Sequence, residues 1–206
     1  MREALMNHLT RHLLIPKSQF GFIKQRSTVL QLLNYLDYCA NIMVEVGCVD
    51  VLYLDYAKAF DIVPHRRLIT KLESYEIGGS VLSWITDLLS GRRQIVTVDG
   101  AASQPVAVTS GIHQGSVLGS ILFVVFINDL SDTIDSFSFL FADDSKVLKH
   151  IKSREDRFAL QRDLATFQLQ SDTWLLRFHA SKCKILAQRS KLILSTHMLT
   201  YLTMSR

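Results

Sequence analysis

Two segments that lie far apart in the chain place carboxylates where strands end. Val51–Leu54 is a short continuous apolar run, typical of a strand buried on both faces, and Asp55 follows it at once. Residues 136–150 read as the two strands of a hairpin, with Asp143 and Asp144 at or beside its turn. If these segments are neighbours in one sheet, three negative charges meet at one edge. This requirement constrains the fold more than any other feature of the sequence.

The remaining pattern interleaves helices with hairpins. Apolar residues at helical spacing predict helices over residues 4–14, 28 to about 46, 66–75, 80–89, 121–130 and 153 to about 176. Alternating or β-branched segments predict strands over residues 94–99, 105–109, 136–141, 145–150 and 181–186. Ser27 is expected to cap the second helix, and Ser153 with Asp156 resembles a capping box for the last one. We expect residues 94–99 and 105–109 to pair across the Asp99–Gly100 turn, and the mixture favours the α+β class.

The composition permits a folded chain and restricts its surroundings only mildly. Of 206 residues, 48% are hydrophobic and 20% are charged, which suits one domain with a sizeable core and excludes global disorder. The net charge of +4 permits a nucleic-acid partner without demonstrating one.

Three observations predict an intracellular protein that is not secreted and has no membrane segment. Cys39, Cys48 and Cys183 are too few and too scattered for a disulfide framework, so we expect free thiols in a reducing compartment. Residues 1–17 alternate charged with apolar positions, unlike a signal peptide. The longest apolar run, residues 120–127, is far shorter than the roughly 18 residues that a membrane-spanning helix needs. The sequence leaves the oligomeric state and the choice between nucleus and cytoplasm open.

The three carboxylates suggest metal-dependent phosphoryl transfer. Uncompensated repulsion among them is unfavourable in a low-dielectric setting, and divalent cations would remove it. Two Mg²⁺ ions roughly 4 Å apart are a recurring device for in-line phosphoryl transfer. Taken singly, each residue also has a structural reading: an Asp-Asp pair is common turn chemistry, and Asp55 can cap the end of its strand.

Several motifs, in a fixed order, resemble a known family. They are Tyr53–Asp61 (YLDYAKAFD), Val63–His65 (VPH), Ser110–Gly119 (SGIHQGSVLG) and Phe141–Asp144 (FADD). Together they resemble the reverse transcriptase domain of non-LTR retrotransposons of the jockey-like kind. Further matches, within a resemblance that covers roughly residues 18–188, are Gln19–Phe22, Gln25–Thr28, Ser90–Gln94, Ile127–Leu130 and Ser181–Lys184.

The resemblance implies a right-hand polymerase palm with partial fingers, built as an antiparallel sheet backed by helices, with the thumb missing. It implies a partial domain over residues 1–188, divided into a fingers remnant (1–50) and a palm (51–188), with residues 189–206 as an unmatched tail. The implied reaction is RNA-directed DNA synthesis, in which the 3′-hydroxyl of a DNA primer on an RNA template attacks a dNTP.

The resemblance also implies roles for individual residues. Asp55, Asp143 and Asp144 match the ligands of two Mg²⁺ ions, with Mn²⁺ as the alternative metal. Lys182 matches a lysine near the leaving phosphate that is a candidate general acid, although a solvated strand lysine is an equally good reading.

Five more residues match substrate-binding positions. The Tyr56 carbonyl corresponds to a group that contacts a metal, and Phe60 to a ring beneath the sugar that excludes a 2′-hydroxyl, with a core phenylalanine as the alternative. Gln114 and Gly115 match a loop that lines the nucleotide and template pocket, and Arg26 matches a position near the nucleotide or template.

The chain also departs from the family pattern. His113 and Ser120 replace prolines that would stiffen the Gln114 loop, and Ile23 stands where the family usually has arginine. No departure removes a predicted metal ligand. The alternative function is a degenerate or domesticated fragment that at most binds RNA or a protein partner.

Overall fold

A computed structural model describes residues 1–45 and 47–189. The chain divides into two compact units. The first comprises Met1–Leu14 and Lys58–Phe126, and the second comprises, among the described residues, Ile15–Ala57 and residues 127–189. Within the described residues, every helix is too short or too polar to cross a lipid bilayer.

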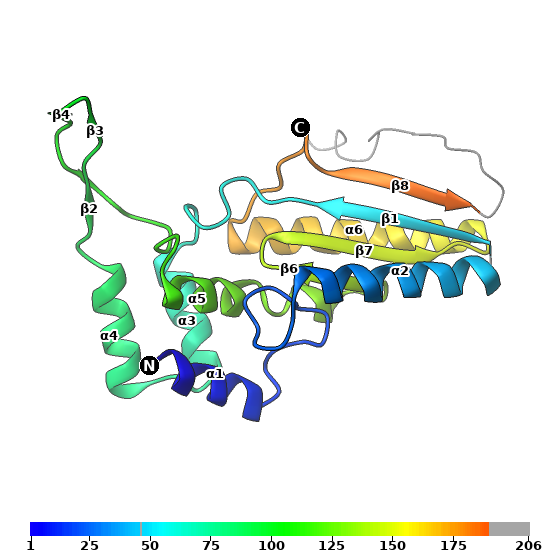
Figure 1. The fold of residues 1–206 in the computed structure, drawn as a ribbon, viewed down its shortest axis with the longest axis horizontal. Coiled ribbons are helices and arrows are strands. Elements are labelled where there is room, and N and C mark those ends of the chain that lie inside the picture. Colours follow the sequence, from blue (N-terminus) through cyan, green and yellow to red (C-terminus); the bar gives the residue numbers. More distant parts are fainter. Residues whose placement is uncertain (46, 190–206) are drawn as a thin grey trace. The chain divides into compact units, whose positions relative to one another are not determined.

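The second unit is built on a four-stranded antiparallel sheet (Figure 1). Its strands, in spatial order, are β6 (Phe137–Phe141), β7 (Asp144–His150), β1 (Cys48–Leu54) and β8 (Lys184–Arg189). The central strand β1 is buried at almost every position, as its continuous apolar run predicts. β8 begins at Lys184, later than the predicted residue 181, because the backbone N–H groups of Lys182 and Cys183 close a turn onto the carbonyl of His179.

Helix α2 (Thr28–Glu45) packs on one face of this sheet. It begins where predicted, since the Ser27 hydroxyl accepts a hydrogen bond from the Leu30 N–H at 3.1 Å. The core on this face is formed by apolar residues of α2, of the three strands nearest to it and of the loop before it: Phe20, Tyr35, Cys39, Ile42, Val49, Val51, Phe139 and Leu148.

Helix α6 (Arg154–Trp174) contacts β7 and the short 3-10 helix η1 (Leu130–Thr133). The predicted capping box of Ser153 and Asp156 is present at its N-terminus. Near the middle of α6, the buried Asp163 carboxylate accepts a hydrogen bond from the Ser136 N–H at 3.0 Å. This contact anchors the segment that enters β6.

The first unit contains helices and a long hairpin. Its helices are α1 (Arg2–Arg11), α3 (His65–Ser74), α4 (Gly79–Leu89) and α5 (Val117–Ile127, whose last residue is assigned to the second unit). The predicted hairpin around Asp99 and Gly100 is present as two short ladders. β2 (Arg93–Gln94) pairs with β5 (Val106–Ala107), but β3 (Thr97–Val98) pairs with β4 (Ala101–Ala102) instead of with residues 105–109. All eight strand residues are exposed, so no buried face extends the ladders.

Helix α5 starts earlier and ends earlier than the predicted range 121–130. It starts earlier because the Ser116 hydroxyl accepts the Gly119 N–H at 2.9 Å, which caps the helix ahead of its apolar stretch. Residues 121–127 are all buried, as expected for a helix that is apolar on every side.

Candidate active site

The register of the sheet brings Asp55 to the same edge as the acidic pair. β1 and β7 are antiparallel, and Leu54, the last residue of β1, pairs with Ser145 of β7. Asp55 follows Leu54, and Asp144 precedes Ser145. Continuing the antiparallel register by one residue therefore sets Asp55 opposite Asp144.

The turn between β6 and β7 carries the third carboxylate. Phe141 pairs with Asp144, which leaves Ala142 and Asp143 as the connecting residues. Ala142 has φ 53°, in the left-handed region that tight hairpin turns use. The prediction that Asp143 and Asp144 lie at or beside a tight turn between two strands is confirmed.

The neighbouring charges act on Asp143. Burial raises the pKa of its half-buried carboxyl group, while a hydrogen bond with its own backbone lowers this pKa. The negative charges of Asp144 and Asp55 raise the pKa further, and the positive charge of Lys182 lowers it. The structure thus brings Asp55 and Asp144 close enough to act on the charge of Asp143, and the catalytic role of the three carboxylates stays a prediction.

Lys182 neutralises Asp55. Its Nζ lies 3.3 Å from both carboxylate oxygens, Oδ1 and Oδ2. The lysine side chain is 59% exposed and that of Asp55 only 22% exposed, so the ammonium group approaches the carboxylate from the solvent side. In the described ranges 1–45 and 47–189, no group of three or more His, Cys, Asp or Glu side chains is arranged to hold a metal ion.

The chemistry of the three carboxylates nevertheless fits a divalent cation. Carboxylate oxygens are the ligands that Mg²⁺ and Mn²⁺ prefer. Asp143 experiences two like charges, and the buried Asp55 Oδ1 has an ion-pair contact with the exposed Lys182 ammonium but no hydrogen bond within the described residues. A cation between these oxygens would relieve the repulsion.

The backbone of the 177–183 segment fixes Asp55 and Tyr56. The Asp55 carbonyl accepts the His179 N–H at 2.8 Å, and Tyr56 forms an antiparallel bridge with Phe178. The Tyr56 ring stacks on Phe178 with 4.7 Å between centroids, and burial raises the pKa of its hydroxyl. The Tyr56 side chain is therefore part of the core, and the predicted contact of its carbonyl with a metal stays a prediction.

Arg26 is engaged within its own segment of the second unit. Its Nη1 donates to the carbonyls of Pro16, at 3.0 Å, and of Gln19. The guanidinium carbon lies 5.7 Å from the centroid of the Phe20 ring, and burial lowers the pKa of the group. These contacts assign Arg26 to the organisation of residues 16–20, and its predicted contact with nucleotide or template stays a prediction.

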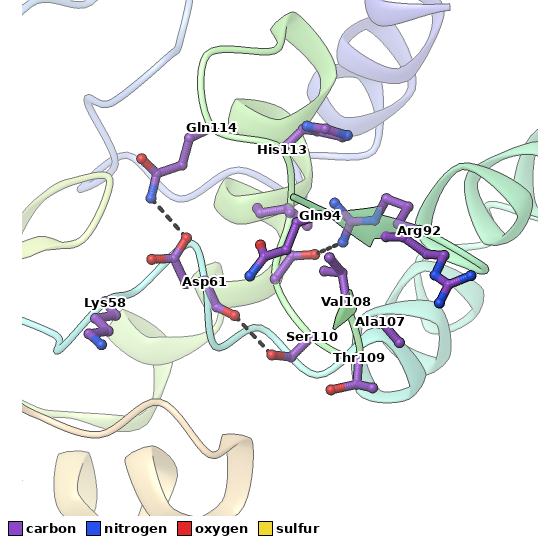
Figure 2. A pocket seen from close by; sticks show the side chains of 13 residues that line it. Lys58, Asp61, Arg92, Gln94, Ala107, Val108, Thr109, Ser110, His113 and Gln114 are labelled. Atoms are coloured by element: carbon purple, nitrogen blue, oxygen red, sulfur yellow. Dashed lines mark hydrogen bonds between the residues drawn. The ribbon is translucent and has the colours of Figure 1, made fainter. Parts of the chain in front are cut away.

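The first unit contains a cavity of about 820 Å³ (Figure 2). Its lining combines three cationic side chains, several polar groups and backbone: Lys58, Asp61, Arg92, Arg93, Gln94, residues 107–112, His113 and Gln114. Figure 2 shows Gln114 pointing toward Asp61, whose Oδ1 accepts a hydrogen bond from Gln114 Nε2 at 3.1 Å. The cavity is thus suited to an anionic or polar ligand.

Arg92 and Gly111 stabilise one wall of this cavity. The Arg92 guanidinium donates to the Gly111 carbonyl and lies 3.0 Å from His65 Nε2. Gly111 has φ 84°, and a Cβ there would lie 2.6 Å from the Asp61 carbonyl oxygen. Only glycine meets both conditions without a shift of the backbone.

Two other predicted substrate residues, Phe60 and Gly115, also belong to this unit. The Phe60 ring is half-buried and stacks on Phe123 with 4.3 Å between centroids. Gly115 has φ 75° and open space where a Cβ would be, so its backbone conformation, rather than crowding, favours glycine. Their predicted contacts with a nucleotide stay predictions.

Sequence reasoning missed two residues that support the carboxylate turn, Gln19 and Gly21. Both lie in a matched motif, yet neither stood out chemically, because an isolated glutamine or glycine in a loop has no periodic signal. The structure shows Gln19 fully buried and Gly21 in contact with the backbone of Ala142. The sequence signal that could have found them is their place in the matched Gln19–Phe22 motif.

Comparisons with known proteins agree with the resemblance. The family model described as reverse transcriptase (RNA-dependent DNA polymerase) matches residues 1–204. The RNA-directed DNA polymerase from mobile element jockey of Drosophila melanogaster is 33% identical over 178 residues, which are 82% of this chain and 19% of that protein. The corresponding jockey protein of Drosophila funebris is 32% identical over 178 residues, with the same two coverages. The chain therefore spans about a fifth of the length of these curated relatives.

Solved structures share the fold. Apo telomerase from Candida tropicalis, truncated from its C-terminal domain, matches with a TM-score of 0.65 at 11% identity, over 96% of this chain and 41% of that one. Telomerase of the same organism in complex with the TWJ fragment of telomeric RNA matches with a TM-score of 0.70 at 9% identity, over 96% and 34%. The predicted α+β palm, an antiparallel sheet with helices packed on it, is confirmed.

Proposed function

The chain belongs to the reverse transcriptase (RNA-dependent DNA polymerase) family, and we propose that it carries the metal-binding centre for RNA-directed DNA synthesis. The observation that carries this proposal is the register of β1 and β7, which sets Asp55 opposite Asp144 and beside Asp143. Taken one at a time, Asp55 can be explained as a cap at the end of its strand, and Asp143 and Asp144 as turn residues. These separate readings do not explain why Asp55 and Asp144 gather beside Asp143 at one edge of the sheet, where their negative charges act on it.

The proposed metal ligands are Asp55, Asp143 and Asp144, and the proposed ions are two Mg²⁺, with Mn²⁺ as the alternative. When bound at such a site, divalent ions lower the pKa of a hydroxyl nucleophile and stabilise charge on the phosphates. The residues of the chain contribute fixed negative charge at a defined edge. The backbone contacts to residues 177–183 hold Asp55 in place without its side chain.

Lys182 is proposed to act on the leaving phosphate. Its ammonium reaches Asp55 from solvent, at 3.3 Å. A side chain with this reach exchanges readily between the carboxylate and an incoming phosphate oxygen. There it would donate a hydrogen bond or a proton to the departing pyrophosphate.

The proposed substrates are an RNA template, a DNA primer and a dNTP. The cationic side chains of Lys58, Arg92 and Arg93 line the cavity of the first unit, where they are suited to phosphate groups. Phe60 is proposed to exclude a 2′-hydroxyl on the incoming nucleotide. Gln114 and Gly115 are proposed to line the nucleotide and template pocket. Arg26 is proposed to order the neighbouring residues 16–20. Since all these substrates are intracellular and the three cysteines are free thiols, we also infer an intracellular location.

The direct test is primer extension on an RNA template with Mg²⁺, comparing the wild-type chain with Asp143→Ala. We expect the substitution to reduce nucleotide incorporation by at least about 10³-fold, because it removes a ligand worth several kcal/mol of charge stabilisation. The matched control is Asp135→Ala, which removes an exposed aspartate before β6. Equal incorporation by wild type and Asp143→Ala would refute the site, and RNA binding without incorporation would favour a non-catalytic fragment.

A further inference from the structure

Residues 18–21 run alongside the edge strand β6 of the second unit. The Leu140 N–H donates to the Ser18 carbonyl at 2.8 Å, and the Phe20 N–H donates to the Leu140 carbonyl at 2.7 Å. Gln19 and Leu140 thereby form a parallel bridge. This pairing ends next to the turn that carries Asp143.

Gln19 bonds to that turn directly. Its side chain is fully buried, and its Oε1 accepts hydrogen bonds from the Gly21 N–H at 2.7 Å and from the Ala142 N–H at 3.2 Å. Ala142 has a left-handed backbone conformation, which is unfavourable for a residue with a side chain. The bond to Gln19 stabilises this conformation in the residue that immediately precedes Asp143.

Gly21 allows the two backbones to meet. A Cβ on Gly21 would lie 2.3 Å from the Ala142 nitrogen and 3.0 Å from the Phe141 carbonyl carbon. The bonds from Arg26 to the carbonyls of Pro16 and Gln19 stabilise the same segment from its other side. The turn is therefore supported by a buried side chain, a glycine contact and an ordered loop.

We propose that Gln19 is a positioning residue that presents Asp143 to the metal shared with Asp55 and Asp144. Repulsion from its neighbours favours rotation of the Asp143 carboxylate away from the site, and the Ala142 bond opposes a rearrangement of the turn. Without this acceptor, two buried N–H groups lose their partner, and the turn relaxes. The inference rests on the proposed function for the presence of the metal, and on the hydrogen bonds alone for the support of the turn.

The test measures Mn²⁺ binding by the full chain from the EPR signal of free Mn²⁺, without nucleotide or primer. Gln19→Met keeps the length of the side chain and removes the acceptor. We expect its Mn²⁺ affinity to fall roughly tenfold, the scale seen when groups that orient metal ligands are lost. In parallel, hydrogen exchange at the Ala142 amide is expected to accelerate.

The matched control is Gln31→Met. Gln31 is also a buried glutamine of the second unit, and its Oε1 accepts a bond from Lys146 Nζ at 2.9 Å instead of supporting the turn. We expect this variant to lose comparable thermal stability while its Mn²⁺ affinity stays within about twofold of wild type. If Gln19→Met does not fold, Gln19→Asn, whose carbonyl is one methylene short of the turn, replaces it with the same expectation.

The outcomes separate this inference from the proposed function. Equal Mn²⁺ affinity in wild type and the Gln19 variants, or no Mn²⁺ binding by wild type, would overturn the positioning role. Weaker binding by Gln19→Met alone supports it, even if the wild-type chain incorporates no nucleotide in the primer-extension assay. In that case the proposed function fails while the positioning role stands.

Discussion

The carboxylate edge of the second unit and the cavity of the first unit are built in opposite ways. At the edge, three negative charges are fixed by a buried sheet and by its register. Around the cavity, cationic and polar groups sit on exposed two-residue strands and a loop. A ligand that needs sub-ångström placement is served by a sheet, while one held by phosphate charge tolerates a more adaptable wall.

The two regions also differ in what keeps them folded. The edge depends on buried hydrogen bonds such as the one that the Ala142 N–H donates to Gln19 Oε1. The cavity wall depends on Gly111 and on the hydrogen bonds of Arg92. We therefore expect substitutions in the cavity wall to change the stability of the chain without changing metal binding, and substitutions at the sheet edge to change metal binding.

The largest effect on stability is expected for Gly111→Ala. Its Cβ would meet the Asp61 carbonyl oxygen at 2.6 Å, and its φ of 84° disfavours a side chain. We expect the free energy of unfolding in urea to fall by about 3 kcal/mol. Gly115→Ala is the control, because its φ is also positive but its Cβ has open space, so about 1 kcal/mol is expected. Equal losses would mean that the Asp61 contact is unimportant.

Two adjacent arginines should differ in what they support. Arg93 is exposed, while Arg92 donates to the Gly111 carbonyl and to that of Leu89 at 3.2 Å. Arg93→Gln is expected to weaken RNA binding a few-fold and to reduce the slope of log affinity against log salt by about 0.7, without a change in stability. Arg92→Gln should instead lower the melting temperature. An unchanged salt slope for Arg93→Gln would exclude a phosphate contact.

The smallest effect concerns the pH dependence of stability. Because burial and two like charges raise the pKa of Asp143, the folded chain binds a proton here more readily than the unfolded chain. This residue therefore contributes stability at low pH that is lost as the pH rises through the raised pKa. Asp143→Asn should remove that slope and stabilise the metal-free chain at pH 7 by less than about 1 kcal/mol, after allowance for solvent screening. Unfolding curves at pH 4 to 8 would show it, and identical slopes would contradict it.

The sequence predicted the parts of the fold that rest on strong local patterns. Three predicted features are confirmed: the apolar run of β1, the hairpin around Asp143 and Asp144, and the capping box at Ser153. They could be predicted because each depends on residues that are neighbours along the chain. The starts of α5 and β8 differed because a few hydrogen bonds to Ser116 and to the His179 carbonyl decide them. Such contacts leave no periodic signal.

The candidate site shows the same limit. Placing Asp55 at the same sheet edge as Asp143 and Asp144 needed only the strand pattern and the assumption that the strands are neighbours, whereas the register that sets Asp55 opposite Asp144 came from the structure. The roles of Gln19 and Arg26 depend on where a loop lies against β6, which no local pattern specifies. Arg26 illustrates this well, since this conspicuous cation in a matched motif donates to the backbone carbonyls of Pro16 and Gln19.

The central claim is that Asp55 and Asp143 bind the same cation, and a double-mutant cycle of Mn²⁺ binding tests it most directly. Wild type, Asp55→Asn, Asp143→Asn and the double variant would be titrated by EPR at neutral pH. Shared ligation predicts that each single substitution weakens binding by roughly tenfold or more and that the double variant is little worse than either one. Affinities that fall additively, or single variants that bind as wild type does, would contradict a shared site.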